Sequence, residues 1–161
     1  MKHHGSKSLY VTLRNQELYN AYLQELAAAD HINVREVCRL AALHPCSQFW
    51  ISEERAREVI RQLDHGIPIE QVARGKKCYK STADSESYRA MIEELYGVYK
   101  RLRSENPEAS VFELTCMAVN SPASQFFLTP ESARKCIYKY RRVRSIMDRL
   151  RNHAQFINKN K

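Results

Sequence analysis

Apolar residues recur every three or four positions over two long stretches of this chain, residues 15–29 and 87–103. This spacing places the apolar side chains on one face of a helix, so each stretch is predicted to form an amphipathic α-helix. The apolar positions are Leu18, Tyr22, Leu26 and Ala29 in the first stretch, and Tyr88, Ile92, Leu95, Tyr99 and Leu102 in the second.

A capping box follows each stretch and marks the start of a second helix. Asn33 with Glu36, and Ser110 with Glu113, place a cap side chain before the helix and a carboxylate at its third position. The cap oxygen accepts a backbone N–H of the first turn, while the carboxylate accepts the N–H of the cap residue. The predicted second helices are mostly apolar, belong to the core and span residues 34–43 and 111–119.

A proline ends each second helix, because Pro45 and Pro122 push the residue before them out of the α region. A short connector follows, and its three successive apolar residues either form a brief strand or fill the core. Ser52 and Thr129 then cap a third helix. The remaining predicted helices are the third helices, over residues 53–63 and 130–152, and a short helix over residues 68–73.

The elements occur twice in the same order because the sequence itself repeats. Residues 33–60 align without gaps with residues 110–137, at the 77-residue offset that separates Pro45 from Pro122. Eleven of the 28 paired positions are identical: Val34/Val111, Glu36/Glu113, Ala41/Ala118, Pro45/Pro122, Ser47/Ser124, Gln48/Gln125, Phe49/Phe126, Glu54/Glu131, Ala56/Ala133, Arg57/Arg134 and Ile60/Ile137. We interpret the repeat as a duplicated small domain, since two copies are too few to propagate a solenoid.

The predicted fold is therefore all-α, with two tandem three-helix units that each contain a capped helix-connector-helix. The first repeat unit is expected over residues 1–66. Residues 67–86 form a basic linker that can hold a short helix. The second repeat unit, with a long basic C-terminal helix, is expected over residues 87–161.

Charge adds a functional hypothesis. The 161 residues include 26 Lys and Arg against 18 Asp and Glu, a formal net charge of +8, and residues 134–161 hold ten basic side chains and one acidic one. Such an excess favours a polyanionic partner, and we expect phosphate contacts to nucleic acid, double-stranded DNA in particular. The alternative is a solvated helix face. The candidate contacts are Arg134, Lys135, Lys139, Arg141, Arg142 and Arg144 on the last helix, and Lys76 and Lys77 in the linker.

The order helix, connector, helix is similar to a helix-turn-helix, and two such units would read two half-sites. On this hypothesis Gln48, Gln125 and Arg57 contact bases or phosphates, because Gln suits adenine and Arg suits guanine or phosphate. Two features oppose it: the connector exceeds a standard turn, and Glu53 and Glu54 repel phosphate at the start of the third helix. The alternative is that Ser-Gln-Phe forms a structural corner.

Catalytic and metal chemistry have little support in the sequence. Five cysteines without C-x-x-C spacing indicate free thiols in a reducing compartment. The histidines lack metal-ligand spacing, and there is no glycine-rich phosphate loop or nucleophile elbow. No apolar run approaches the roughly 18 residues of a membrane span, and no secretory signal is recognisable. We therefore expect a cytoplasmic, non-enzymatic protein with no metal, cofactor, small-molecule substrate or membrane partner.

The string Pro-x-Ser-Gln-Phe-Phe-Leu-Thr-Pro-Glu-Ser-Ala-Arg at residues 122–134, with its twin around Pro45, resembles a pattern in short uncharacterised helical proteins of Bacteroides-type phages and mobile elements. The resemblance covers only the two 28-residue segments. It implies a phage or mobile-element setting and at most a DNA-binding role, and it assigns no catalytic residue.

Two alternatives to DNA binding stay open. In the first, the protein is a protein–protein interaction module whose basic tail serves an acidic partner. In the second, the last helix forms a homodimer through Ile146, Met147 and Leu150.

Overall fold

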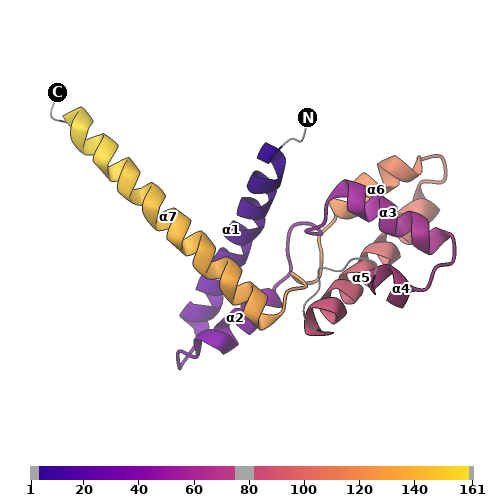
Figure 1. The fold of residues 1–161 in the computed structure, drawn as a ribbon, viewed down its shortest axis with the longest axis horizontal. Helices are drawn as coiled ribbons and strands as arrows, with labels where there is room; N and C mark the ends of the chain where they lie inside the picture. Colours follow the sequence, from indigo (N-terminus) through magenta and orange to yellow (C-terminus); the bar gives the residue numbers. More distant parts are fainter. Residues whose placement is uncertain (1–3, 75–81, 160–161) are drawn as a thin grey trace. The chain divides into compact units, whose positions relative to one another are not determined.

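The computed structural model describes residues 4–74 and 82–159, and over these residues the secondary structure consists of seven helices (Figure 1). The predicted all-α class is confirmed, since no strand occurs in the described part of the chain. The helices are α1 (His4–Ala28), α2 (Val34–Ala42), α3 (Glu53–Asp64), α4 (Ile69–Arg74), α5 (Thr82–Glu105), α6 (Val111–Val119) and α7 (Pro130–Lys159).

Helix starts and ends follow the sequence signals, with the largest differences in the long helices. The bounds of α6 are those predicted, whereas α1 begins at His4 rather than near residue 15. Leu9 and Leu13, in this additional part of α1, are exposed. A helix segment that buries no apolar face lacks the periodic signal on which the prediction rested.

The two predicted capping boxes differ. At α6 the Ser110 hydroxyl accepts the Glu113 N–H at 3.2 Å, and the Glu113 carboxylate accepts the Ser110 N–H at 2.8 Å, which lowers the pKa of Glu113. At α2 only the first bond forms, from the Glu36 N–H to the Asn33 side chain at 3.3 Å. The Asn33 N–H donates instead to the carbonyl of His31 at 3.1 Å. The second bond of the box, from the Asn33 N–H to the Glu36 carboxylate, therefore does not form.

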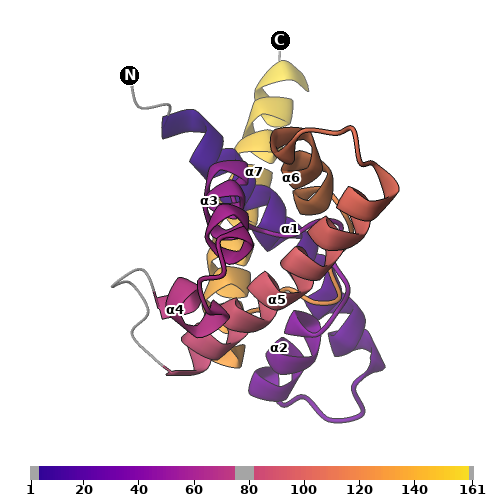
Figure 2. The ribbon, with the colours of Figure 1, turned by 90° about the vertical axis from the view of Figure 1, so that its right-hand side faces the viewer.

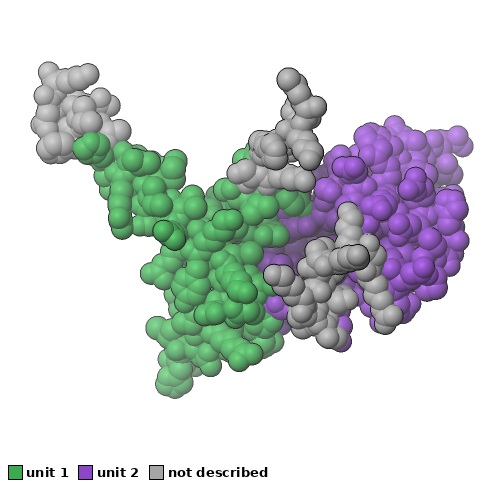
Figure 3. Space-filling model, viewed as in Figure 1, with its two compact units in different colours: residues 1–41, 130–161 green, residues 42–129 purple. Residues whose placement is uncertain are grey.

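The helices divide into two compact units (Figure 3). Unit 1 contains residues 1–41 and 130–161, and unit 2 contains residues 42–129. These units do not follow the predicted boundaries, because α7 lies with α1 and most of α2, while α3 lies with α5 and α6. Each third helix therefore packs with the first two helices of the other sequence repeat.

The two connectors pair with each other inside unit 2. The Cys46 N–H donates to the Ala123 carbonyl at 3.0 Å, and the Ala123 N–H donates back to Cys46 at 3.1 Å, which forms an isolated antiparallel bridge. These two residues are separated by the 77-residue offset of the sequence repeat. The bridge lies before the three successive apolar residues of each connector, and these residues form no strand.

Two further backbone bonds flank this bridge and obey the same offset. The Phe49 N–H donates to the Val119 carbonyl at 2.9 Å, and the Phe126 N–H donates to the Ala42 carbonyl at 3.0 Å. Both phenylalanine side chains are buried, with 0% and 3% of their surface exposed. The apolar residues of the connectors therefore fill the core of unit 2.

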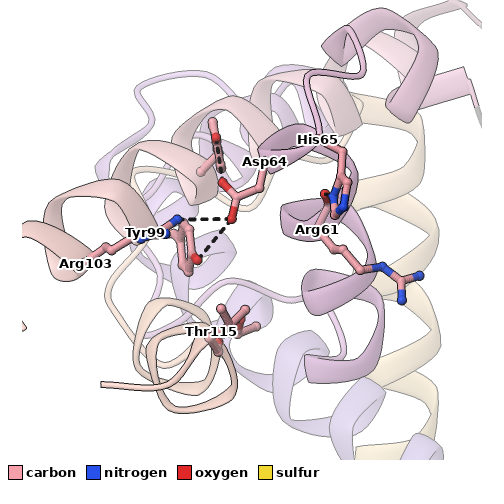
Figure 4. A network of polar contacts seen from close by, with 8 residues as sticks. Arg61, Asp64, His65, Tyr99, Arg103 and Thr115 are labelled. Atoms are coloured by element: carbon pink, nitrogen blue, oxygen red, sulfur yellow. Dashed lines mark hydrogen bonds and ion pairs between the residues drawn. The ribbon is translucent and has the colours of Figure 1, made fainter. Parts of the chain in front are cut away.

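In unit 2, α5 packs against α4 and α6, while α3 packs against α4 and α6 (Figure 2). Val59, Val72 and Ile92 form an apolar cluster among α3, α4 and α5. At the end of α3, the Asp64 carboxylate accepts the Tyr99 hydroxyl at 3.2 Å and lies 3.3 Å from the Arg103 guanidinium (Figure 4). This network joins the end of α3 to α5.

A glycine ends α3. The Gly66 N–H donates to Leu63 and the Ile67 N–H donates to Gln62, at 2.9 and 3.1 Å, which is the Schellman arrangement. Gly66 itself has φ 77°, a left-handed conformation that residues with a Cβ atom adopt only with strain.

We predict opposite effects of two glycine substitutions. Gly66→Ala lowers the free energy of unfolding by about 1 kcal/mol, because its φ angle strains any Cβ. Gly97 occupies an exposed position of α5 with nothing within 4 Å of a new Cβ. Gly97→Ala therefore raises the free energy of unfolding by about 0.5–1 kcal/mol. Urea unfolding of both variants measures these changes. A neutral or stabilising Gly66→Ala would contradict the assigned helix end.

Candidate nucleic-acid interface

Helix α7 has an anchored part and a free part. Near its start, Ala133 and Ile137 are buried with 0% and 2% of their surface exposed, and the helix packs against α1. After Tyr140 every described side chain as far as His153 is exposed. Figure 1 shows α7 continuing as one helix past its crossing with α1, and in Figure 3 its far half stands clear of the rest of unit 1.

Contacts with Tyr19 of α1 mark the boundary between the two parts. The rings of Tyr19 and Tyr140 lie 5.4 Å apart, and the guanidinium of Arg144 lies over the Tyr19 ring at 5.7 Å. A cation over an aromatic face is attracted by the ring quadrupole. Arg144, a predicted phosphate contact, is therefore held against α1.

The exposed part of α7 stays helical because of its residue types. It contains five Arg residues together with Met147 and Leu150, and these residue types have high helix propensity. Asp148 and Arg151 form a weak pair at 4.0 Å, three residues apart. The many cations towards the C-terminal end also complement the negative end of the helix dipole.

Two of the predicted basic contacts are already paired at the start of α7. Arg134 and Lys135 lie 2.9 and 3.7 Å from the carboxylate of Glu131. The hydrogen bonds from Arg134 lower the pKa of Glu131, so this acid stays ionised.

The predicted contacts further along α7 are open to solvent. Lys139, Arg141 and Arg142 are exposed, and no ion pair involves them within the part of the chain that the structure describes. Arg149 shares this environment and was missed as a candidate. Its signal in the sequence was its position seven residues after Arg142, which is itself seven residues after Lys135.

Seven residues are close to two helical turns, so Lys135, Arg142 and Arg149 form a row along one face of α7. We call this set the basic row. Lys139 lies beside it, whereas Arg141 lies about 100° from the centre of the row around the helix. The exposed apolar residues of the free half are centred about 90° from this row, so a cationic stripe and an apolar stripe lie side by side.

The remaining described candidates lie in unit 2, whereas the basic row lies in unit 1. The guanidinium of Arg57 lies over the Phe112 ring at 5.1 Å. The backbone carbonyls of Gln48 and Gln125 both lie 3.2 Å from the Cys46 sulfur, which donates to them within the paired connectors. These three residues therefore belong to a different compact unit from the basic row. Lys76 and Lys77 lie outside the described residues.

The connectors support the structural-corner interpretation of Ser-Gln-Phe rather than a helix-turn-helix. Phe49 and Phe126 are buried, and the Ser124 N–H donates to the Glu94 carboxylate at 2.7 Å. In addition, α2 and α3, which would form one helix-turn-helix, fall mainly into different compact units. Neither predicted helix-turn-helix therefore lies within one compact unit.

The cysteines of the described regions are Cys38, Cys46, Cys116 and Cys136, and all four are free thiols. Burial raises the pKa of Cys38, which keeps this thiol protonated. Among the described residues, no group of three or more His, Cys, Asp or Glu side chains is arranged to hold a metal ion. In the same residues, no helix has the length and apolar character needed to cross a membrane.

No protein-family model, curated protein or solved structure matches this chain. The resemblance to phage and mobile-element proteins stays a prediction.

The division of α7 into an anchored and a free part predicts unequal effects of two matched substitutions. Ile137→Ala empties a buried site and lowers the free energy of unfolding by about 2–4 kcal/mol. Ile146→Ala, at a side chain that is 49% exposed, changes it by no more than about 0.5 kcal/mol. Urea unfolding of the two variants checks this. Equal losses would mean that the far half of α7 is packed as tightly as the start.

Proposed function

We propose that the protein binds nucleic acid, with double-stranded DNA as the expected ligand, through the cationic face of α7. The observation that supports this proposal is the basic row with Lys139 beside it, on a helix whose far half stands clear of the rest of unit 1. Side chains that are not neutralised within the protein retain their full attraction for phosphate.

The dimensions of the basic row suit a duplex. At 1.5 Å per residue, Lys135 to Arg149 extend over about 21 Å of helix. This length corresponds to about six phosphates of one DNA strand, at 3.4 Å per phosphate. The major groove is wide enough to admit an α-helix, and the same cations also suit an approach along the backbone.

The proposed contacts are to phosphates and not to bases. Lys and Arg side chains on an exposed helix hold the backbone and carry no sequence information unless they also meet base edges. Gln48 and Gln125, the residues best suited to read adenine, lie in the connectors of unit 2. We therefore propose binding with little sequence preference and a strong dependence on salt.

The test is a titration of the full chain with a fluorescent duplex at several salt concentrations. We expect the logarithm of the association constant to fall linearly with the logarithm of the salt concentration. Arg142→Glu combined with Arg149→Glu should remove at least two phosphate contacts. The slope should then decrease by about 2, and the affinity at about 100 mM salt should fall at least roughly tenfold.

A matched control keeps the same change of net charge. Arg61→Glu with Arg101→Glu alters two exposed arginines of unit 2. We expect this variant to retain the slope and to lose less than about threefold in affinity, since only the long-range field changes. If both double variants lost affinity equally, net charge alone would explain the effect of the substitutions. If the unaltered chain did not bind the duplex at low salt, the proposal would be refuted.

A further inference from the structure

Exposed apolar side chains lie beside the basic row, centred about 90° from it around α7. Val143, Ile146, Met147 and Leu150 are 46, 49, 55 and 60% exposed. They follow one another at intervals of three and four residues, which places them on one stripe of the helix. We call these four residues the apolar seam.

The spacing of the seam is that of a coiled coil. Tyr140, Val143, Met147 and Leu150 are separated by three, four and three residues, the repeat of the a and d positions of a heptad. A stripe limited to these positions is narrow, whereas a helix that lies in a membrane surface presents a wider apolar face. The pattern therefore favours another helix as the occupant.

Cations border the seam on both sides. Lys139, seven residues before Ile146, lies at the g position of the heptad, and Arg144 and Arg151 lie at successive e positions. The e and g positions face those of the partner helix and select it by charge. Asp148 is the one acidic residue between Lys139 and His153, and it occupies a b position away from the seam.

This charge pattern disfavours a second copy of the chain as the partner. In a parallel pair of α7 helices, Lys139 of one copy would face Arg144 of the other. In an antiparallel pair, Arg144 would face Arg151. Like charges at these positions are destabilising. The homodimer expected as one alternative from the sequence would therefore place cations together at both sides of the seam.

We propose that the apolar seam of α7 is the docking site for an acidic amphipathic helix of another protein. Such a helix would cover the seam with apolar a and d residues and place Glu or Asp opposite Lys139 and Arg151, while Arg144 stays over Tyr19 of α1. This inference goes beyond nucleic-acid binding and does not rest on it, because the seam and the basic row are different residues of α7, centred about 90° apart around the helix.

The test uses the full chain and two labelled synthetic peptides of three heptads each. Both have Ile at a and Leu at d, and they differ only in carrying Glu or Lys at every e and g position. Fluorescence anisotropy measures their binding. We expect the Glu peptide to bind at least tenfold more tightly than the Lys peptide. Equal binding of the two, or no binding of the Glu peptide, would overturn the proposal.

Substitutions locate the binding site. Met147→Gln with Leu150→Gln removes apolar surface while keeping helix propensity and charge, and should weaken the Glu peptide at least tenfold. The matched control, Leu9→Gln with Leu13→Gln, alters two exposed leucines of α1 and should leave the affinity within twofold. The duplex affinity should also stay within twofold in the Met147→Gln, Leu150→Gln variant, which separates this proposal from nucleic-acid binding.

Two further measurements identify other occupants. Sedimentation velocity should give the unaltered chain as a monomer; a dimer that Met147→Gln with Leu150→Gln dissociates would assign the seam to a second copy. Vesicles of phosphatidylcholine with phosphatidylserine should not be bound through the seam. Vesicle binding that the same variant abolishes, without binding of the Glu peptide, would assign the seam to a lipid surface. Either result would overturn the proposal.

Discussion

The reciprocal backbone bonds between Cys46 and Ala123 hold the two connectors together, and the arrangement of the third helices depends on this pairing. Each connector leads from a second helix to a third helix. With the connectors paired and with Phe49 and Phe126 buried beside the bridge, α3 packs on α6 and α7 packs on α1. An exchange of third helices between the two sequence repeats follows, and it places the most basic helix of the chain in unit 1.

Unit 1 buries only the beginning of α7, and this explains the character of the rest of the helix. Ala133 and Ile137 supply the anchor, while the residues after Tyr140 have no core to join. The free half stays helical because its residues have high helix propensity and because its cations complement the negative end of the helix dipole. Two surfaces of different chemistry are thereby displayed on one helix: the basic row for phosphate, and the apolar seam with its cationic borders for an acidic helix.

Much of the local structure could be predicted from the sequence, because caps, prolines and the 3.6-residue period act over a few residues. The Ser110 box and the bounds of α6 are examples. The exchange of third helices could not be predicted. Ile60 and Ile137 occupy equivalent positions of the repeat and are both buried, so their apolar character does not indicate which repeat each helix packs against. The same local rules located the basic residues of α7. Whether Gln48 and Gln125 belong to the same interface depends on tertiary structure, which local rules do not give.

The central claim is that α7 after Tyr140 is a free helix whose cationic face binds nucleic acid. Hydrogen exchange of the full chain, read by mass spectrometry with and without a DNA duplex, tests it most directly. The account predicts that amides of residues 141–153 exchange much faster than those of residues 131–140 in the protein alone, and slow on addition of the duplex. Equal protection along α7 in the free protein, or no change in residues 141–153 with the duplex, would contradict it.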